Sequence, residues 1–276
     1  MAVTFNRPKK SLGQNFLIDA NICDKITELS GVSEDEHVLE IGPGRGFLTE
    51  RLLSKKAYVT AVELDDALSE YLKDKFKASD KFRLINSDIL KVNLEEIFRD
   101  TPGRVKVVSN IPYNISTPII ETLCRYRKKI AEAVLMVQKE VAIRLLSAPG
   151  NKNYGLTTLN LSLYATGEKL MDVPPESFNP PPEVMSSVIR LKISEELIYP
   201  LKDDIIFRNL TGTVFRERRK MIRNTMTKYL LELGIDKRKA AEVFELAGIN
   251  GESRPEDIGT ADYVKMSNII SGILAG

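Results

Sequence analysis

The chain has 276 residues, of which 43% are hydrophobic and 28% charged, and its formal net charge is +2. This composition is typical of a globular protein of one or two domains, and no apolar stretch reaches the roughly 18 residues of a membrane span. Two cysteines make no disulfide framework and no metal-ligand spacing, so we expect a cytoplasmic protein without a metal. The single histidine, His37, excludes a histidine-based triad or a histidine metal site elsewhere in the chain.

Helix-like and strand-like segments alternate over the first half of the chain. The first helix is expected over residues 20–30, because Asp19 is a good N-cap and Gly31 follows its end. Apolar, β-rich runs lie at 37–41, 58–63, 82–86, 105–109 and 131–137. Helical segments follow these runs at 47–55, 65–76, 93–99, 116–126 and 138–147. This order predicts an α/β fold with a parallel sheet covered by helices on both faces.

The remaining segments predict how the sheet closes and where a second domain begins. Residues 165–173 and 186–193 flank a proline-rich loop and are expected to form two antiparallel closing strands. After about residue 196 the strand signal stops, and helical periodicity marks residues 203–215, 218–232, 236–247 and 261–274. We therefore predict an α/β domain over residues 1–196 and a small all-helical domain over residues 197–276.

Polar or glycine-rich features fall at the carboxyl ends of four successive predicted strands. The turn E-I-G-P-G-R-G (40–46) ends the first strand, and Glu63 ends the second. Asp88 follows the third strand and Asn110 the fourth. This edge of an open parallel sheet binds ligands, and a carboxylate at the second strand suits ribose hydroxyls. Because the glycine spacing is not G-x-G-x-x-G, a nicotinamide cofactor is disfavoured and another adenosine-containing cofactor is favoured.

Five segments, taken in order, resemble the motifs of the ribosomal RNA adenine N6-dimethyltransferases that act on the small ribosomal subunit. They are K-K-S-L-G-Q-N-F-L-I-D (9–19), E-I-G-P-G-R-G-F-L-T (40–49), N-I-P-Y-N-I-S-T-P (110–118), F-N-P-P-P-E-V (178–184) and F-R-E-R-R-K-M-I-R-N (215–224). The resemblance runs from about Pro8 to beyond residue 260. It implies a seven-stranded Rossmann-like methyltransferase fold, S-adenosylmethionine as cofactor and an RNA-binding helical domain.

The resemblance also implies a reaction and a partner. The reaction is direct methyl transfer to N6 of two adjacent, flipped-out adenines near the 3′ end of small-subunit ribosomal RNA. The partner is an immature small ribosomal subunit, with an added role in its biogenesis. We expect a monomer that makes no contact with membranes.

Cofactor-binding residues follow from the same resemblance. Residues 1–30 would cover the cofactor, and Glu63 would bind its ribose hydroxyls while Asp88 binds its adenine amine. Carboxylate oxygens accept such hydrogen bonds well. The implied set is Gln14, Asn15, Leu17, Gly42, Gly44, Glu63, Leu64, Asp88, Ile89 and Asn110.

The catalytic residues are expected in the segment after the fourth strand. The side-chain oxygen of Asn110 and the carbonyl of Ile111 would accept hydrogen bonds from the adenine N6, which points its lone pair at the methyl group. Pro112 would stiffen this turn. Tyr113 would stack on the flipped adenine, with Phe178 on the other side. Alternatively, residues 110–113 form an ordinary turn and Phe178 is a core residue. Because residues 110–113 lie beside the predicted nucleotide site, a catalytic role is favoured.

Cations gather in the last of the five motifs. From this motif to Lys228, six cations (Arg216, Arg218, Arg219, Lys220, Arg223 and Lys228) occur with one acid, Glu217. A second cluster lies at 125–129, and Arg7, Lys9 and Lys10 lie near the N-terminus. Such runs are more often a solvated helix face, but the coincidence with the motif favours phosphate binding by Arg216, Arg218, Arg219, Lys220 and Arg223.

Three other functions stay open. The related macrolide-resistance enzymes, which methylate large-subunit ribosomal RNA, share N-I-P-Y, although Pro118 and residues 215–224 favour the small-subunit enzymes. DNA adenine methyltransferases more often carry Asp-Pro-Pro-Tyr or Asn-Pro-Pro-Tyr. A ribosome-assembly factor without catalysis is disfavoured, because the acidic and aromatic site residues are intact. Glu183, Met185 and Leu156 depart from the family pattern and make the RNA contacts less certain than the reaction.

Overall fold

The computed structural model describes residues 14–275, which form two compact units. The first contains residues up to 142 together with 165–195, and the second contains 143–164 together with 196 onwards. The sequence analysis placed one boundary at residue 196 and assigned 143–164 to the first domain. This segment packs with the second unit instead, because Tyr154, Leu159 and Leu163 lie in that unit's hydrophobic core.

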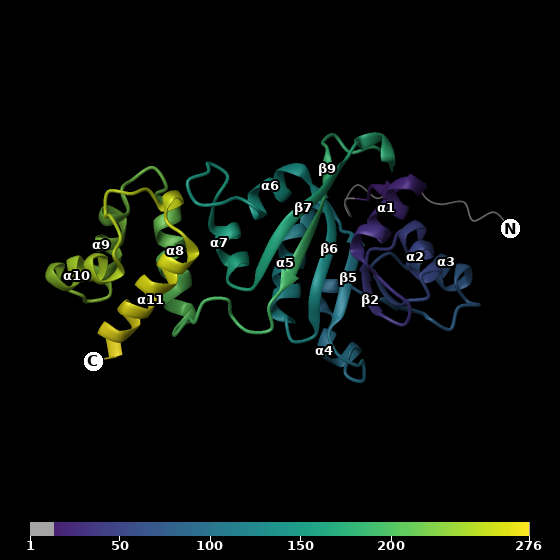
Figure 1. The fold of residues 1–276 in the computed structure, drawn as a ribbon, viewed down its shortest axis with the longest axis horizontal. Helices are drawn as coiled ribbons and strands as arrows, with labels where there is room; N and C mark the ends of the chain where they lie inside the picture. Colours follow the sequence, from purple (N-terminus) through teal and green to yellow (C-terminus); the bar gives the residue numbers. More distant parts are fainter. Residues whose placement is uncertain (1–13, 276) are drawn as a thin grey trace. The chain divides into compact units, whose positions relative to one another are not determined.

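A seven-stranded sheet forms the centre of the first unit, in the order β4-β3-β2-β5-β6-β9-β7 (Figure 1). Its strands are β2 (His37–Ile41), β3 (Tyr58–Glu63), β4 (Phe82–Asn86), β5 (Val105–Asn110), β6 (Ile130–Gln138), β7 (Ala165–Val173) and β9 (Ser186–Ile193). The first five are parallel, and β9 runs antiparallel to both β6 and β7. The predicted α/β fold, its five parallel strands and its antiparallel closing pair are thereby confirmed.

Helices cover both faces of this sheet. They are α1 (Ala20–Ser30), α2 (Phe47–Ser54), α3 (Asp66–Lys75), α4 (Leu94–Ile97) and α5 (Ser116–Arg125), and α6 (Lys139–Leu145) leads out of the unit. Successive residues of a strand point to opposite faces. Val38 and Leu39 of β2 are both fully buried, as are Val107 and Val108 of β5, so neither face is open to water there. The order of strands and helices places the carboxyl ends of β2, β3, β4 and β5 along one edge.

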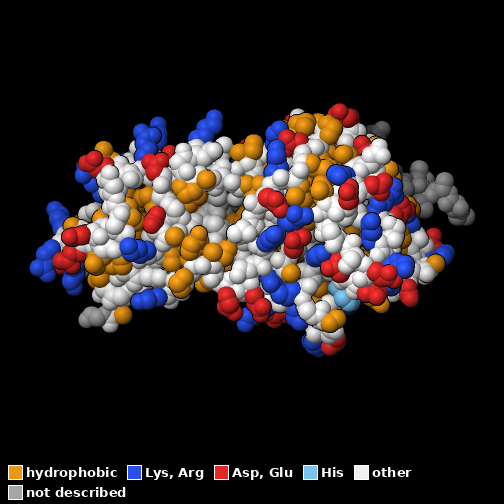
Figure 2. Space-filling model, viewed as in Figure 1, with side chains coloured by type: hydrophobic (Ala, Val, Ile, Leu, Met, Phe, Trp, Pro, Cys, Tyr) orange, Lys and Arg blue, Asp and Glu red, His pale blue; other side chains and the backbone are white. Residues whose placement is uncertain are grey.

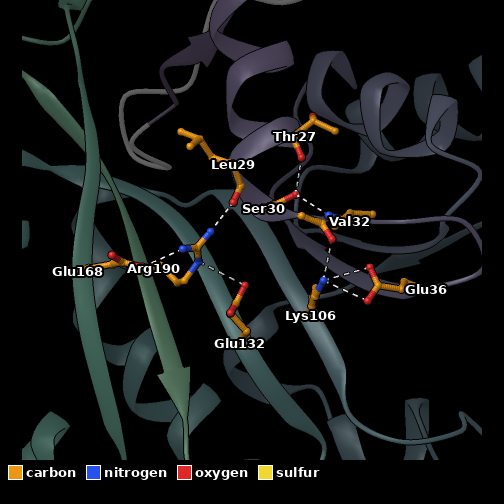
Figure 3. Close-up of polar contacts among 10 residues, drawn as sticks. Thr27, Leu29, Ser30, Val32, Glu36, Lys106, Glu132, Glu168 and Arg190 are labelled. Atoms are coloured by element: carbon orange, nitrogen blue, oxygen red, sulfur yellow. Dashed lines mark hydrogen bonds and ion pairs between the residues drawn. The ribbon is translucent and has the colours of Figure 1, made fainter.

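Polar contacts attach the end of α1 to the sheet (Figure 3). Arg190 of β9 donates a hydrogen bond to the carbonyl of Leu29 and forms ion pairs with Glu168 at 2.7 Å and Glu132 at 3.5 Å. Lys106 of β5 donates to the carbonyl of Gly31 at 2.9 Å. These side chains satisfy carbonyls that a helix leaves unpaired at its C-terminus.

A second, two-stranded sheet was missed by the sequence analysis. It pairs β1 (Phe16–Leu17) with β8 (Phe178–Asn179), antiparallel, with Leu17 opposite Phe178. Next to it, the amide of Ile18 donates to the carbonyl of Ser177 at 2.9 Å. Two-residue strands carry no periodicity, so no local pattern could predict a pairing across about 160 residues of chain.

The second unit is all helical, as predicted (Figure 1). Its helices are α7 (Leu156–Ser162), α8 (Asp204–Arg216), α9 (Ile222–Glu232), α10 (Lys237–Ala247) and α11 (Thr260–Ala275). The predicted helix over 218–232 begins four residues later. The amides of Ile222 and Arg223 donate to the carbonyls of Ser253 and Gly251, so this loop fixes the first turn of α9. None of the helices between residues 14 and 275 is long and apolar enough to cross a membrane.

Candidate active site

A cavity of about 240 Å³ lies at the carboxyl ends of β2, β3, β4 and β5. Its lining comes from five parts of the chain: 14–17, 40–45 with 47–48, 62–64 with 68, 87–90 and 110–115. All ten predicted cofactor-binding residues lie among them: Gln14, Asn15, Leu17, Gly42, Gly44, Glu63, Leu64, Asp88, Ile89 and Asn110. Chain segments almost 100 residues apart thus meet at one site, as expected for the ligand edge of an open parallel sheet.

The floor of the cavity is the glycine turn after β2. Gly42 and Gly44 have φ of 65° and 58°, a backbone conformation that favours glycine. A Cβ on Gly44 would lie 2.8 Å from the ring of Phe16, so any other residue would displace this ring. The guanidinium of Arg45 also lies over the ring of Phe16, 5.0 Å from the ring centroid. The glycine turn and the segment before α1 therefore enclose the cavity together.

Glu63 lies at the end of β3, where it is 6% exposed. Its carboxylate accepts hydrogen bonds from the amide of Asp65 at 2.9 Å and from the amide of Gly44 at 3.2 Å. Burial raises the pKa of Glu63, and these two amides partly oppose that shift. A carboxylate oxygen has more than one acceptor position, so Glu63 retains capacity for a ligand diol while it braces the glycine turn.

Glu40 is a site residue to which the sequence analysis gave no role. It is 2% exposed at the end of β2 and accepts a hydrogen bond of 2.7 Å from the hydroxyl of Thr49. Burial, together with the nearby Glu63 carboxylate, raises the pKa of Glu40 to about 8, against the opposing effect of the Thr49 hydrogen bond. The sequence signal was present in the motif that begins at residue 40, but the burial comes from tertiary packing.

The adenosine end of the predicted site is lined by residues after β3 and β4. Asp88 caps the short 3₁₀ helix Ile89–Lys91 by accepting from the amide of Leu90 at 3.0 Å, and its other oxygen lies 4.0 Å from Lys91. Ile89 is buried, whereas Leu64 is 49% exposed at the rim. One carboxylate edge and two apolar side chains match the needs of a purine ring.

Asn110, the last residue of β5, has a fixed orientation. Its Nδ2 donates a hydrogen bond of 3.2 Å to the carbonyl of Asn15. Because a carbonyl only accepts, this contact determines which end of the amide is nitrogen. The opposite atom, Oδ1, is buried and has no hydrogen-bond partner within residues 14–275. Buried acceptors without a partner are rare in folded proteins, and one on a cavity wall points to a ligand.

Pro112 and Tyr113 line the same cavity, but Phe178 does not. The ring of Phe178 is 2% exposed and meets the ring of Tyr113 edge-on, with centroids 6.5 Å apart and planes at 73°. The hydroxyl of Tyr113 lies 2.5 Å from Oγ of Ser186, a residue that the sequence analysis did not select. The structure thus brings together every predicted catalytic residue, with Phe178 one layer behind Tyr113.

The predicted RNA-binding cations of the second unit divide into two groups. Three are paired with acids of the same unit: Arg218 with Glu256 at 3.3 Å, Lys220 with Glu217 at 2.9 Å and Arg223 with Glu252 at 3.2 Å. Arg216 and Arg219 are exposed and form no ion pair within the described part of the chain. On the face of the molecule shown in Figure 2, Lys and Arg side chains are mixed with Asp and Glu side chains.

Other predicted features are placed as follows. Arg7, Lys9 and Lys10 lie outside the described residues. Among the residues that are described, no cluster of three or more His, Cys, Asp or Glu could hold a metal ion. Of the three departures from the family pattern, Leu156 and Met185 are each 36% exposed and Glu183 is exposed.

Comparison with known proteins gives one consistent family. A family model described as ribosomal RNA adenine dimethylase matches residues 5–271. The ribosomal RNA small subunit methyltransferase A of Pseudomonas putida is 39% identical over 263 residues, which is 95% of each chain. The protein of the same name from Caldanaerobacter subterraneus is 37% identical and covers 96% of this chain and 97% of its own.

Solved structures agree in fold. A dimethyladenosine transferase from Plasmodium falciparum superposes with a TM-score of 0.75 at 27% identity, over 91% of this chain and 95% of its own. The 23S rRNA methyltransferase ErmE superposes with a TM-score of 0.69 at 23% identity, over 93% of this chain and 100% of its own. At 23% identity, the comparison with ErmE shows only that the two chains share a fold.

Proposed function

The chain belongs to the ribosomal RNA adenine dimethylase family, and from this membership we propose that it methylates the small-subunit ribosomal RNA through the cavity at the strand ends. It is an S-adenosylmethionine-dependent adenine N6-dimethyltransferase of ribosomal RNA. Its targets are two adjacent adenines near the 3′ end of that RNA within an immature small subunit. The 39% identity to a small subunit methyltransferase supports this choice over the large subunit.

The residues of the cavity fit S-adenosylmethionine. The left-handed turn at Gly42 and Gly44 lets a ligand lie against the backbone, and Glu63 and Asp88 present carboxylate oxygens at the ends of adjacent strands. We assign the ribose hydroxyls to Glu63 and the adenine amine to Asp88, with Ile89 and Leu64 against the adenine ring. Gln14, Asn15 and Leu17 lie over the methionine end.

The unpaired Oδ1 of Asn110 is the observation on which this assignment rests most. When bound, S-adenosylmethionine supplies a methyl group on a positively charged sulfonium. The adenine N6 is a weak nucleophile because its lone pair is delocalised into the ring. Asn110 accepts a hydrogen bond from N6, draws the nitrogen out of the ring plane and directs the lone pair, and the carbonyl of Ile111 assists. The amide is preorganised because Asn15 already holds its other end, so little reorganisation is needed.

The target adenine leaves its RNA stack before transfer. We assign its stacking surface to the ring of Tyr113, with Pro112 holding the turn. Burial raises the pKa of Tyr113 to about 12, so the phenol stays neutral and does not act as a base. Phe178 supports the edge of the Tyr113 ring. Because Phe178 is buried and does not line the cavity, its predicted contact with the second side of the base requires a local movement of the chain.

RNA phosphates bind to the helical unit in this proposal. Arg216 and Arg219 are the foremost candidates, because they are exposed and have no acidic partner in the described residues. Arg218, Lys220 and Arg223 are second, since each must first leave an ion pair. Phosphate contacts orient the RNA without reading its sequence. The enzyme acts as a monomer in the cytoplasm, needs no metal and also contributes to small-subunit biogenesis.

Transfer of labelled methyl from S-adenosylmethionine to undermethylated small subunits tests the proposal, with large-subunit RNA as a parallel substrate. We expect label in dimethyladenine of the small-subunit RNA. Label only in large-subunit RNA would identify an enzyme of the macrolide-resistance type. No label in either RNA, with S-adenosylmethionine still bound, would identify an assembly factor without catalysis.

A further inference from the structure

Within residues 14–275, the hydroxyl of Tyr113 has one hydrogen-bond partner, Ser186, which is fully buried. Ser186 is the first residue of β9 and is 0% exposed, and its Oγ lies 2.5 Å from the Tyr113 oxygen. It lies opposite Gln138 of β6 and Val173 of β7, in the interior of the sheet. A buried hydroxyl without a hydrogen bond costs roughly 1–3 kcal/mol, so the hydrogen bond to Tyr113 offsets the cost of burying Ser186.

The neighbouring serine serves a different set of residues. Ser187 donates a hydrogen bond of 2.6 Å to Asp172, which also pairs with Lys139 at 3.0 Å and Lys169 at 3.2 Å. Side chains of adjacent strand residues point to opposite faces, so the two hydroxyls are separated by the sheet. Of the two serines, Ser186 is the one that contacts a residue of the cavity wall, Tyr113.

We propose that Ser186 is a positioning residue for the target adenine, because it fixes the ring on which that base stacks. This inference rests on the stacking role proposed above for Tyr113. One end of the Tyr113 ring is held by the 3₁₀ helix Tyr113–Ile115, and the other end is held by Ser186 of β9, which pairs with β6 and β7 on its two sides. The edge contact with Phe178 limits the tilt of the ring. A ring held at both ends presents one face in one orientation, which is what preorganised stacking requires.

The strength of this effect follows from its chemistry. Both groups are neutral hydroxyls, because the pKa of the Tyr113 phenol is raised to about 12 by burial. Loss of one neutral hydrogen bond changes an equilibrium by roughly 3- to 10-fold. We expect a loss of this size in kcat, with no change in affinity for S-adenosylmethionine, because Ser186 does not line the cofactor cavity.

A double-mutant cycle tests the proposal on the full chain with undermethylated small subunits. Ser186→Ala and Tyr113→Phe remove the same hydrogen bond from its two ends. Each should lower kcat roughly 3- to 10-fold, and the double variant should be no slower than the slower single variant. Affinity for S-adenosylmethionine, measured by calorimetry, should stay within about 2-fold of the original. The control, Ser187→Ala, should keep the original kcat.

Several outcomes would overturn the inference. Multiplying effects in the double variant would mean that the two residues act separately, and a fully active Ser186→Ala beside an inactive Tyr113→Ala would remove the role of Ser186 alone. A Tyr113→Ala variant with the original kcat would instead remove the proposed stacking role itself. If Ser186→Ala fails to fold, Tyr113→Phe decides alone: an unchanged kcat then overturns the inference.

Discussion

The side-chain amide of Asn110 donates to the backbone carbonyl of Asn15 at 3.2 Å, across 95 residues of chain. This contact joins the segment before α1 to the end of β5 and leaves Oδ1 of Asn110 without a partner in residues 14–275. The cover of the cofactor cavity therefore orients the group that we assign to the target adenine. In the proposed assignment, cofactor binding and catalytic geometry therefore depend on the same few residues.

Asn110→Ala removes the acceptor and should abolish most of the transfer. We expect kcat to fall about 100-fold or more, the range seen when one preorganised hydrogen-bonding group is removed from an active site. Affinity for S-adenosylmethionine should stay largely intact, since other residues bind its ribose and adenine. A turnover assay beside a calorimetric titration measures both quantities.

Glu63→Ala should have the opposite effect, a loss of affinity for S-adenosylmethionine rather than of kcat. The carboxylate of Glu63 braces Gly44 and is assigned to the ribose hydroxyls, so its loss should weaken S-adenosylmethionine binding at least about 10-fold, since a hydrogen bond to a charged group contributes roughly 1.5–3 kcal/mol. With saturating cofactor, kcat should recover most of its original value. Glu63→Gln, which retains one acceptor, should lose less affinity. An equal loss of affinity in the Asn110 and Glu63 alanine variants would contradict this division of roles.

Local patterns predicted most of the sheet. The bounds of β2, β3, β4, β7 and β9 are those expected from the sequence. Four of them are β-rich runs of mainly apolar residues, and β7 was expected from its place beside the proline-rich loop. The positions of Glu63, Asp88 and Asn110 at one edge followed from the order of strands and helices alone. The amino-acid sequence was therefore sufficient to predict which edge of the sheet carries the cavity.

Non-local contacts set the limits of this prediction. The pairing of Leu17 with Phe178, the bond between Ser186 and Tyr113 and the burial of Glu40 each join segments that only the folded chain brings together. Charge counting also treated the cations of residues 215–224 as one group. Which of them are paired depends on acids at positions such as Glu252 and Glu256, in a loop that no local pattern relates to α9.

Arg190 links three strands to the end of α1, so its removal should destabilise the first unit (Figure 3). Arg190→Met would leave the carbonyl of Leu29 without its hydrogen-bond donor and the partly buried Glu132 without its ion-pair partner. We expect the free energy of unfolding to fall by about 1–3 kcal/mol, the range for a buried polar group that loses its partner. Urea denaturation measures it. Glu168→Gln, at an exposed partner, should change it by less than about 1 kcal/mol, and equal effects would contradict the role of Leu29 and Glu132.

Glu40 should make stability depend on pH. Its pKa is about 8 in the folded chain against an ordinary value of 4.5, so its contribution is fully present below about pH 4.5 and is lost as the pH rises through 8. Glu40→Gln keeps an acceptor for Thr49 and cannot ionise. The free energy of unfolding of this variant, minus that of the original, should increase between pH 5 and pH 9 by about 1 kcal/mol or more. A difference that is flat over this range would show that Glu40 is ionised in the folded chain.

Arg216 and Arg219 should contribute more to RNA affinity than their paired neighbours. Each phosphate contact changes the slope of log K against log salt concentration by about 0.7 to 0.9, so Arg216→Gln with Arg219→Gln should flatten that slope by about 1.4 to 1.8. Lys220→Gln with Arg223→Gln removes the same charge, but both cations already bind Glu217 and Glu252, and a smaller change is expected. Binding of each double variant to undermethylated small subunits, titrated over salt concentration, compares the two pairs. If both double variants flatten the slope equally, the ion pairs open at no cost when RNA binds. If neither variant changes the slope, these cations form a solvated helix face and do not bind phosphate.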